Sequence, residues 1–186
     1  MEPFLRQGLD RGEKVIYVLS DTSSLVDVAV CLSEPGQLQN WLSSGQVKVL
    51  HAREVYLNGG VFSAEKMIAK WQQQCELALS EGYPALRAMA EMDWALGAAP
   101  LDELTRYEGL VQELFHRFPV SAVCQYDLRR FSESYAAHQL LAHPWVVARN
   151  QVVANRFYPR TEARQSLDRI PADFSSLLDS VLQSNA

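Results

Sequence analysis

The stretch KVIYVLS, residues 14–20, decides how the chain folds. Its apolar run is short, rich in β-branched and aromatic side chains, and bounded by Gly12 before it and Asp21 after it. A run of this length and composition is typical of a strand that is buried on both faces. Such a strand lies inside a parallel sheet covered by helices on both sides, so the stretch predicts an α/β protein.

Three further segments predict strands of the same sheet, and segments with helical periodicity separate them. The additional strands are expected at residues 47–51, at about 85–91 and at 120–126. The most regular helix begins after Ser63 and repeats apolar residues through Trp71 and Cys75. Alternating strands and helices predict a three-layer α/β fold with a mostly parallel sheet.

The C-terminal part of the sequence follows a different pattern. A short helix capped by Ser132 is expected to end near His143-Pro144, and a pair of strands follows at 145–148 and 152–157. A polar segment at 160–169 then precedes an amphipathic helix over 174–182. The apolar stripe of that helix predicts either a relay or dimer surface, or simple packing against the sheet.

Composition limits the classes of function. The 186 residues suit one domain, and 48% hydrophobic with 21% charged residues is typical of a soluble globular protein. A net charge of −5 disfavours nonspecific electrostatic binding to nucleic acid, and the apolar runs are too short to span a bilayer. Three cysteines that are far apart and odd in number predict a reducing, cytoplasmic setting.

The usual catalytic motifs are missing from the sequence. It contains no GxSxG nucleophile elbow, no GxxxxGK[ST] phosphate loop and no GxGxxG turn. We therefore expect no enzymatic activity, and the sequence assigns no catalytic residue, no metal ligand and no cofactor.

Polar residues follow each predicted strand, at the edge of the sheet where α/β proteins bind ligands. The third and fourth strands add the aromatic rings of Trp94 and Tyr126, which predicts a pocket that is partly apolar and partly polar. The candidate ligand-binding residues are Glu91, Asp93, Trp94, Cys124, Gln125, Tyr126, Asp127 and His143.

Each of these residues also has an ordinary structural explanation. Strand ends meet solvent and are commonly polar. Glu91 would accept hydrogen bonds from loop amides, Cys124 would be an inert buried side chain, and His143 would mark the end of a helix.

Several segments together resemble one known family. They are FLRQGLDRGEKVIYV, LSSGQVKVLHAREVYLNGGVFSAEKM, LRAMAEMDWAL, YEGLVQELF, VCQYDLRRF and HPWVV, in this order. The set is similar to the MEDS domain, a sensory domain of the DcmR type. The resemblance covers residues 2–158, which predicts a sensory domain over 1–158 and a C-terminal extension over 159–186.

The resemblance implies a non-catalytic sensory or regulatory module that binds a small, partly apolar ligand such as a hydrocarbon derivative. It implies a fold like the KaiC/RecA core without the lysine-bearing phosphate loop, and hence binding rather than hydrolysis. The implied partner is a signalling protein, such as a histidine kinase or a transcription regulator, with a homodimer as a further option. No membrane or direct nucleic-acid partner is implied. The family signature falls on "EMDW", on "CQYD" and on His143-Pro144.

The sequence departs from the family at its start. Family members usually begin with a further strand of the kind HICLFY, whereas this chain starts within the following helix. In a KaiC/RecA-like sheet that strand is expected to be central, so its omission would leave a slot with unpaired backbone groups. Three explanations are open. The true start lies upstream of Met1, the C-terminal strands or a partner chain fill the slot, or the sheet closes in another order.

Two alternative functions follow from the same residues. One is a degenerate KaiC-like nucleotide-binding protein, against which the missing phosphate loop argues. The other is a protein–protein interaction module that uses the sheet edge or the last helix.

Overall fold

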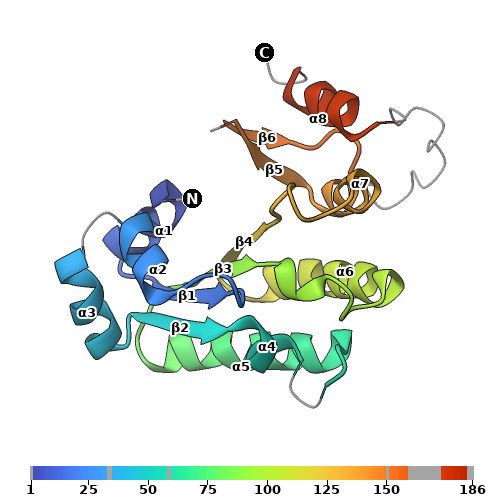
Figure 1. Cartoon of the computed structure of the whole chain (residues 1–186). Coiled ribbons are helices and arrows are strands. Elements are labelled where there is room, and N and C mark those ends of the chain that lie inside the picture. The colour runs from blue at the N-terminus through green and yellow to red at the C-terminus, as the bar shows by residue number, and fades with distance from the viewer. Residues whose placement is uncertain (1, 33–34, 58–59, 150, 159–172, 184–186) are drawn as a thin grey trace. The chain divides into compact units, whose positions relative to one another are not determined.

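The computed structural model describes residues 2–32, 35–57, 60–149, 151–158 and 173–183. The chain forms two compact units, residues 1–126 and 127–186, which Figure 1 draws in one view. No described helix combines the length and the apolar character needed to cross a membrane.

The first unit alternates strands and helices, as the sequence predicts. Its strands are β1 (Lys14–Leu19), β2 (Val47–His51), β3 (Leu86–Glu91) and β4 (Val120–Gln125). Its helices are α1 (Glu2–Asp10), α2 (Leu25–Cys31), α3 (Pro35–Ser44), α4 (Ala52–Tyr56), α5 (Ala64–Ser80) and α6 (Leu101–Arg117), with a short 3₁₀ turn η1 (Asp93–Ala95).

The four strands form one parallel sheet in the order β2-β1-β3-β4. Every residue of β1 and β3 is buried, which confirms the prediction drawn from residues 14–20. Because β3 pairs directly with both β1 and β4, the sheet has no slot between these strands. This continuous order agrees with the explanation by closure of the sheet, whereas β5 (Trp145–Ala148) and β6 (Gln151–Ala154) form a separate sheet and fill no slot in this one.

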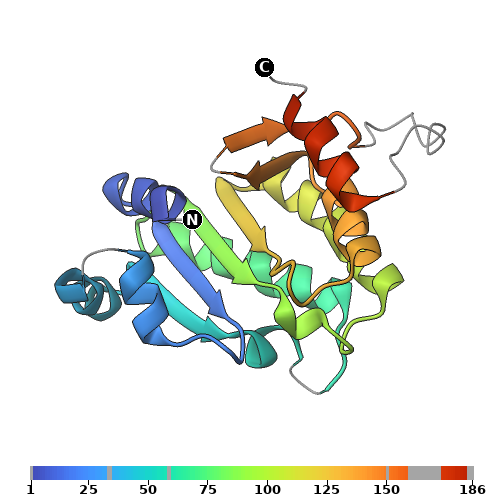
Figure 2. The ribbon, with the colours of Figure 1, turned by 45° about the horizontal axis from the view of Figure 1, so that its top comes forward.

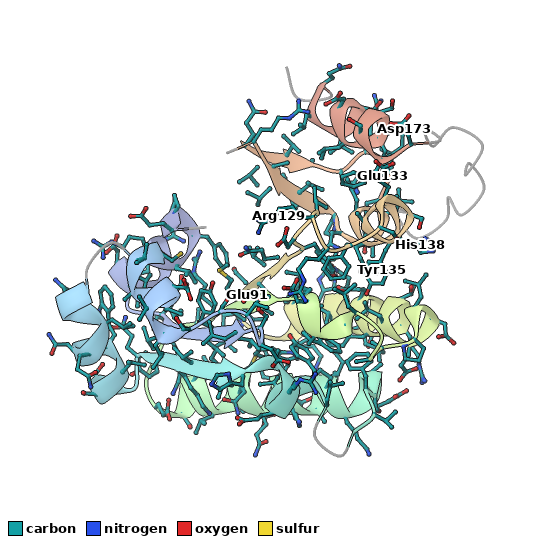
Figure 3. All side chains as sticks on the ribbon, in the orientation of Figure 1. Glu91, Arg129, Glu133, Tyr135, His138 and Asp173 are labelled. Carbon is teal, nitrogen blue, oxygen red and sulfur yellow. The ribbon has the colours of Figure 1, made fainter. Side chains whose placement is uncertain are left out.

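Helices cover both faces of the sheet. Alternate residues of β1 point to opposite sides, and Tyr17 belongs to a core that includes Leu5 of α1, Val28 of α2 and Leu38 of α3. Helices α5 and α6 pack against each other behind the strands, as Figure 2 shows. Side chains fill the space between the layers (Figure 3). The three-layer arrangement predicted from the sequence is thereby confirmed.

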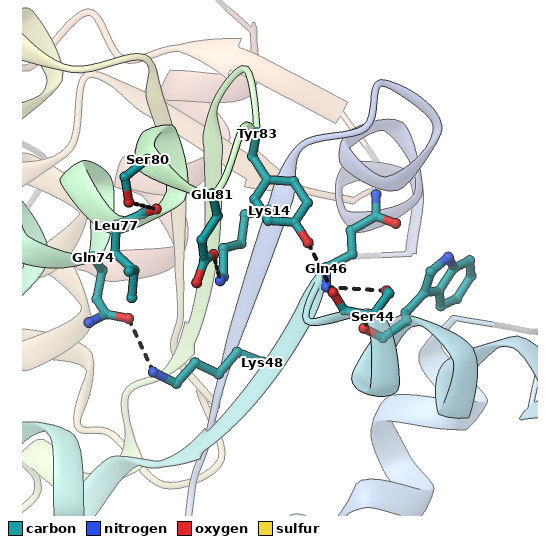
Figure 4. Close-up of polar contacts among 10 residues, drawn as sticks. Lys14, Ser44, Gln46, Lys48, Gln74, Leu77, Ser80, Glu81 and Tyr83 are labelled. Carbon is teal, nitrogen blue, oxygen red and sulfur yellow. Dashed lines mark hydrogen bonds and ion pairs between the residues drawn. The ribbon is translucent and has the colours of Figure 1, made fainter.

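The amino ends of the strands are fastened by polar contacts (Figure 4). Lys14, whose side chain is buried, forms an ion pair with Glu81 after α5. Lys48 on β2 donates a hydrogen bond to Gln74 of α5, with 3.3 Å between nitrogen and oxygen. The Tyr83 hydroxyl donates to the carbonyl oxygen at the end of α3 over 3.3 Å. These contacts tie the helices on both faces to the sheet at this edge.

The second unit contains a hairpin and two helices. These are α7 (Glu133–Ala142), β5 (Trp145–Ala148), β6 (Gln151–Ala154) and α8 (Phe174–Gln183), with β5 and β6 paired antiparallel. Leu177 and Val181 of α8 are fully buried against Leu140 and Val153. The apolar stripe of α8 therefore packs within its own unit. The predicted polar segment at 160–169 lies outside the described residues.

Candidate functional site

The topology of the first unit directs attention to the carboxyl ends of β1 and β3. The chain leaves β1 towards β2 through α2 and α3, whereas it leaves β3 towards β4 through α6. Because crossovers between parallel strands are right-handed, these two connections run over opposite faces of the sheet. In open α/β sheets, ligands bind outside the strand ends where the connections diverge in this way.

Glu91, the last residue of β3, lies at that position and is buried. Its carboxylate accepts a hydrogen bond from the Tyr17 hydroxyl over 2.9 Å and another from the backbone N–H of Ser20, also over 2.9 Å. These bonds join the ends of the two central strands. Burial and the Glu91 carboxylate raise the pKa of Tyr17, so its hydroxyl remains a donor at any physiological pH.

The turn after β1 is held by its own hydroxyls and by one ion pair. The Ser20 and Thr22 hydroxyl oxygens lie 2.9 Å apart, and the backbone N–H of Thr22 donates to the Ser20 hydroxyl over 3.4 Å. Arg53 of α4 pairs with Asp21 at 2.5 Å between nitrogen and oxygen. This rim is therefore polar and carries both signs of charge.

Four aromatic rings form an edge aromatic cluster, Tyr56, Phe62, Trp94 and Tyr107, on the side of the sheet covered by α5 and α6. Tyr56 stacks on Trp94 with ring centroids 4.2 Å apart and an interplanar angle of 6°. Phe62 lies 5.0 Å from Trp94 and meets Tyr107 edge-on at 5.7 Å. Burial raises the pKa of both tyrosines well above the ordinary value, so their hydroxyls stay neutral.

A cavity of about 350 Å³ adjoins this cluster through Tyr56. It lies between α4 and the first turns of α5, at the carboxyl edge of the sheet. It is at the lower end of the size range of small-molecule sites. Its wall combines aliphatic side chains with hydroxyl, amide and ammonium groups, and consists of Val55, Tyr56, Val61, Ser63, Lys66, Met67, Ala69, Lys70 and Gln73.

The structure brings together the predicted residues at the ends of β3 and β4. Glu91 lies opposite Gln125 in the strand register, and the N–H of Met92 donates to the Gln125 carbonyl over 2.9 Å. Asp93 and Trp94 follow within η1. Trp94 is only 7% exposed and its indole N–H finds no acceptor among the described residues, so it contributes to the packing of the edge rather than to an open wall.

Cys124 lies next to Ala90 of β3 in the register, and half-buried Tyr126 follows the end of β4. Burial and the Glu108 carboxylate raise the pKa of the Cys124 thiol well above the ordinary value, so thiolate is scarce at neutral pH. This is what the inert interpretation of Cys124 predicts.

Two of the predicted residues belong to the second unit. Asp127 accepts hydrogen bonds from the backbone and side chain of Arg129, which lower the pKa of its carboxyl to about 2. His143 is the C-cap of α7, and its Nδ1 lies 2.7 Å from the Gln139 carbonyl oxygen. Buried Asn155 donates to the carbonyl of His143 over 2.9 Å, so this position has a clear structural role.

Sequence reasoning missed Tyr17 and most of the aromatic cluster. The sequence pattern places Tyr17 only within a buried strand, although a hydroxyl inside an apolar run requires a hydrogen-bond partner. Tyr56 and Phe62 flank the turn after the second strand, in the segment VYLNGGVF, and their aromatic character was the available signal.

Comparison with known proteins adds one finding. The model of a family described as MEDS, the methanogen/methylotroph DcmR sensory domain, matches residues 1–144. The match covers the whole first unit and α7 of the second. No curated protein matches the chain.

Proposed function

The chain belongs to the MEDS family of sensory domains, and we propose that it senses a small, partly apolar molecule bound at the carboxyl edge of its parallel sheet. Family membership supports a sensory or regulatory role. The nature of the ligand, its location and the receiving partner are our proposal.

The observation that carries the proposal is the cavity beside the edge aromatic cluster. Its wall is partly apolar and partly polar, as in sites that bind small metabolites. A ligand there would touch Tyr56, which stacks on Trp94 at 4.2 Å. Trp94 in turn follows Glu91 by three residues, and Glu91 joins the ends of β1 and β3. The cavity is thus linked to the centre of the edge by the Tyr56–Trp94 stack and by the short chain segment between Trp94 and Glu91.

This link suggests how binding becomes a signal. A ligand that fits one arrangement of Tyr56 and Trp94 better than another shifts the population of the two by its difference in affinity. The turns after β1 and β3 would follow that shift because Glu91 connects them. We propose that a signalling protein, such as a histidine kinase or a transcription regulator, responds to the altered edge.

Isothermal titration calorimetry with small hydrocarbon derivatives tests the proposal. The panel consists of straight-chain alcohols, amides, chlorinated alkanes and carboxylates of one to six carbons. Binding of at least one class to the intact chain is expected, with an affinity that falls in Tyr56→Leu. Tyr83→Leu makes the same substitution at the opposite edge and should leave affinity unchanged.

Two outcomes contradict the proposal. One is the absence of binding by every class at millimolar concentration. The other is an equal loss of affinity in Tyr56→Leu and Tyr83→Leu, which would show that both substitutions weaken binding by destabilising the fold and not by changing the cavity. Trp94→Phe keeps an aromatic ring in the stack, so it should fold and bind while losing one fluorophore.

A further inference from the structure

We infer that the cavity between α4 and α5 takes a small organic anion, specifically a carboxylate that carries a short aliphatic chain. This inference rests on the proposed function, since it names the class of ligand for the same edge. The evidence for it is the charge of the side chains around the cavity, whereas the proposed function rests on the cavity and on the edge aromatic cluster.

Two lysines supply those charges. Lys66 and Lys70 are four residues apart on α5, so they lie on the same side of the helix, and both line the cavity. The Lys66 ammonium group has no hydrogen-bond or ion-pair partner among the described residues. Lys70 Nζ donates to the Val55 carbonyl over 2.7 Å, which uses one of its three N–H donors and directs the group towards α4.

Two carboxylates that lie at the start of α5 have other partners than these lysines. Glu65 forms an ion pair with Arg106 of α6. Glu103 accepts a hydrogen bond from the backbone N–H of Ala64 over 2.8 Å. None of the described residues that line the cavity is acidic. The chain as a whole carries −5, so two uncompensated cations beside one cavity form a distinct local site for an anion.

The rest of the wall selects the remainder of the ligand. Val55, Val61 and Met67 provide aliphatic surface, and Val61 is 73% exposed. An exposed aliphatic side chain at the mouth of a cavity gains contact area when an alkyl chain covers it. The volume of about 350 Å³ limits that chain to a few carbons.

The small number of donors favours a carboxylate over a phosphate ester. Phosphate sites that use a lysine commonly add arginine forks or runs of backbone N–H groups, which satisfy several oxygens at once. The described wall offers no arginine, and its cations are two flexible lysine ammonium groups. A single carboxylate needs no more than this pair.

Calorimetric and fluorescence titrations of the full chain with butyrate test the inference, with butanol, butyramide and propyl phosphate as comparison probes. Butyrate should bind at least about tenfold more tightly than butanol or butyramide, since hydrogen bonds to charged groups are the stronger ones. It should also change the emission of the intact chain more than that of Trp94→Phe, because Tyr56 connects the cavity to Trp94. Tighter binding of propyl phosphate than of butyrate would overturn the choice of carboxylate.

The variants Lys66→Met and Lys70→Met remove one charge each while they keep most of the aliphatic stem. Each should weaken butyrate binding by about tenfold or more. Lys48→Met, which removes the same charge from β2, is the matched control and should bind butyrate like the intact chain. The Lys66 ammonium group has no polar partner among the described residues, so Lys66→Met breaks no such contact and should leave the fold intact.

The two proposals fail in different ways. If butyrate does not bind at millimolar concentration while a neutral probe binds in a Tyr56-dependent manner, the inference is overturned and the proposed function stands. The inference is also overturned, with the proposed function intact, if butyrate binds equally well to Lys66→Met and the intact chain. If neither charged nor neutral probes bind, both proposals fall.

Discussion

Replacement of Tyr17 by phenylalanine removes one of the two hydrogen-bond donors that the described part of the chain provides to the buried Glu91 carboxylate. The hydrogen bond measures 2.9 Å, and the two residues are 5% and 9% exposed, so water cannot readily replace the lost donor. A hydrogen bond to a charged group contributes about 1.5–3 kcal/mol, and the Ser20 N–H remains in place as a second donor. We therefore expect the free energy of unfolding to fall by about 2 kcal/mol, which is roughly 30-fold in the unfolding equilibrium constant.

Urea denaturation followed by tryptophan fluorescence measures this change. The midpoint should fall in Tyr17→Phe while the slope stays constant, because the exposed surface of the unfolded chain is the same. Tyr83→Phe is the control, since its hydroxyl donates to a neutral backbone carbonyl over 3.3 Å and is expected to cost less than about 1 kcal/mol. A loss in Tyr17→Phe no larger than in Tyr83→Phe would mean that Glu91 does not tie the two strand ends together.

Two further predictions concern other parts of the chain. Gly8→Ala would place a Cβ 2.5 Å from the Arg87 Cδ, so thermal unfolding should show a loss of stability. In Gly109→Ala on α6 the new Cβ meets nothing within 4 Å, so the free energy of unfolding should rise by up to about 1 kcal/mol. A gain of stability at both positions would contradict the tight packing around Arg87. Arg129→Gln removes the two side-chain hydrogen bonds and the charge that lower the pKa of Asp127 but keeps the backbone N–H donor at position 129, so an NMR titration should show the pKa of this carboxyl rising from about 2 towards its ordinary value of about 3.9 without reaching it; an unchanged titration would exclude the Arg129 side chain as the cause.

Most of the fold was predictable because its signals are local. The buried run of β1, the Ser63 cap of α5 and the Ser132 cap of α7 act within a few residues, and the structure has all three. The helix α4 and the turn η1 were not predicted, since segments of five and three residues are too short to show a period. The order of the strands was also beyond reach because it depends on contacts between distant segments.

The candidate site was predictable in part for the same reason. Glu91, Asp93 and Gln125 could be placed at one edge, since parallel strands end together. The partner of Glu91 could not be found, because the pairing of Tyr17 with Glu91 depends on the register between β1 and β3. Trp94 was expected to form an open wall, but stacking on Tyr56 buries it. Similarity to the KaiC/RecA core stays a prediction.

Hydrogen–deuterium exchange of the full chain, with and without a bound probe from the panel, is the sharpest test of ligand binding at the carboxyl edge. We expect slower exchange in two places at this edge, the start of α5 and the turns after β1 and β3. The amino edge, where Lys14 pairs with Glu81, should be unaffected. Protection confined to the amino edge, or binding with no change of exchange at the carboxyl edge, would show that the ligand is held elsewhere.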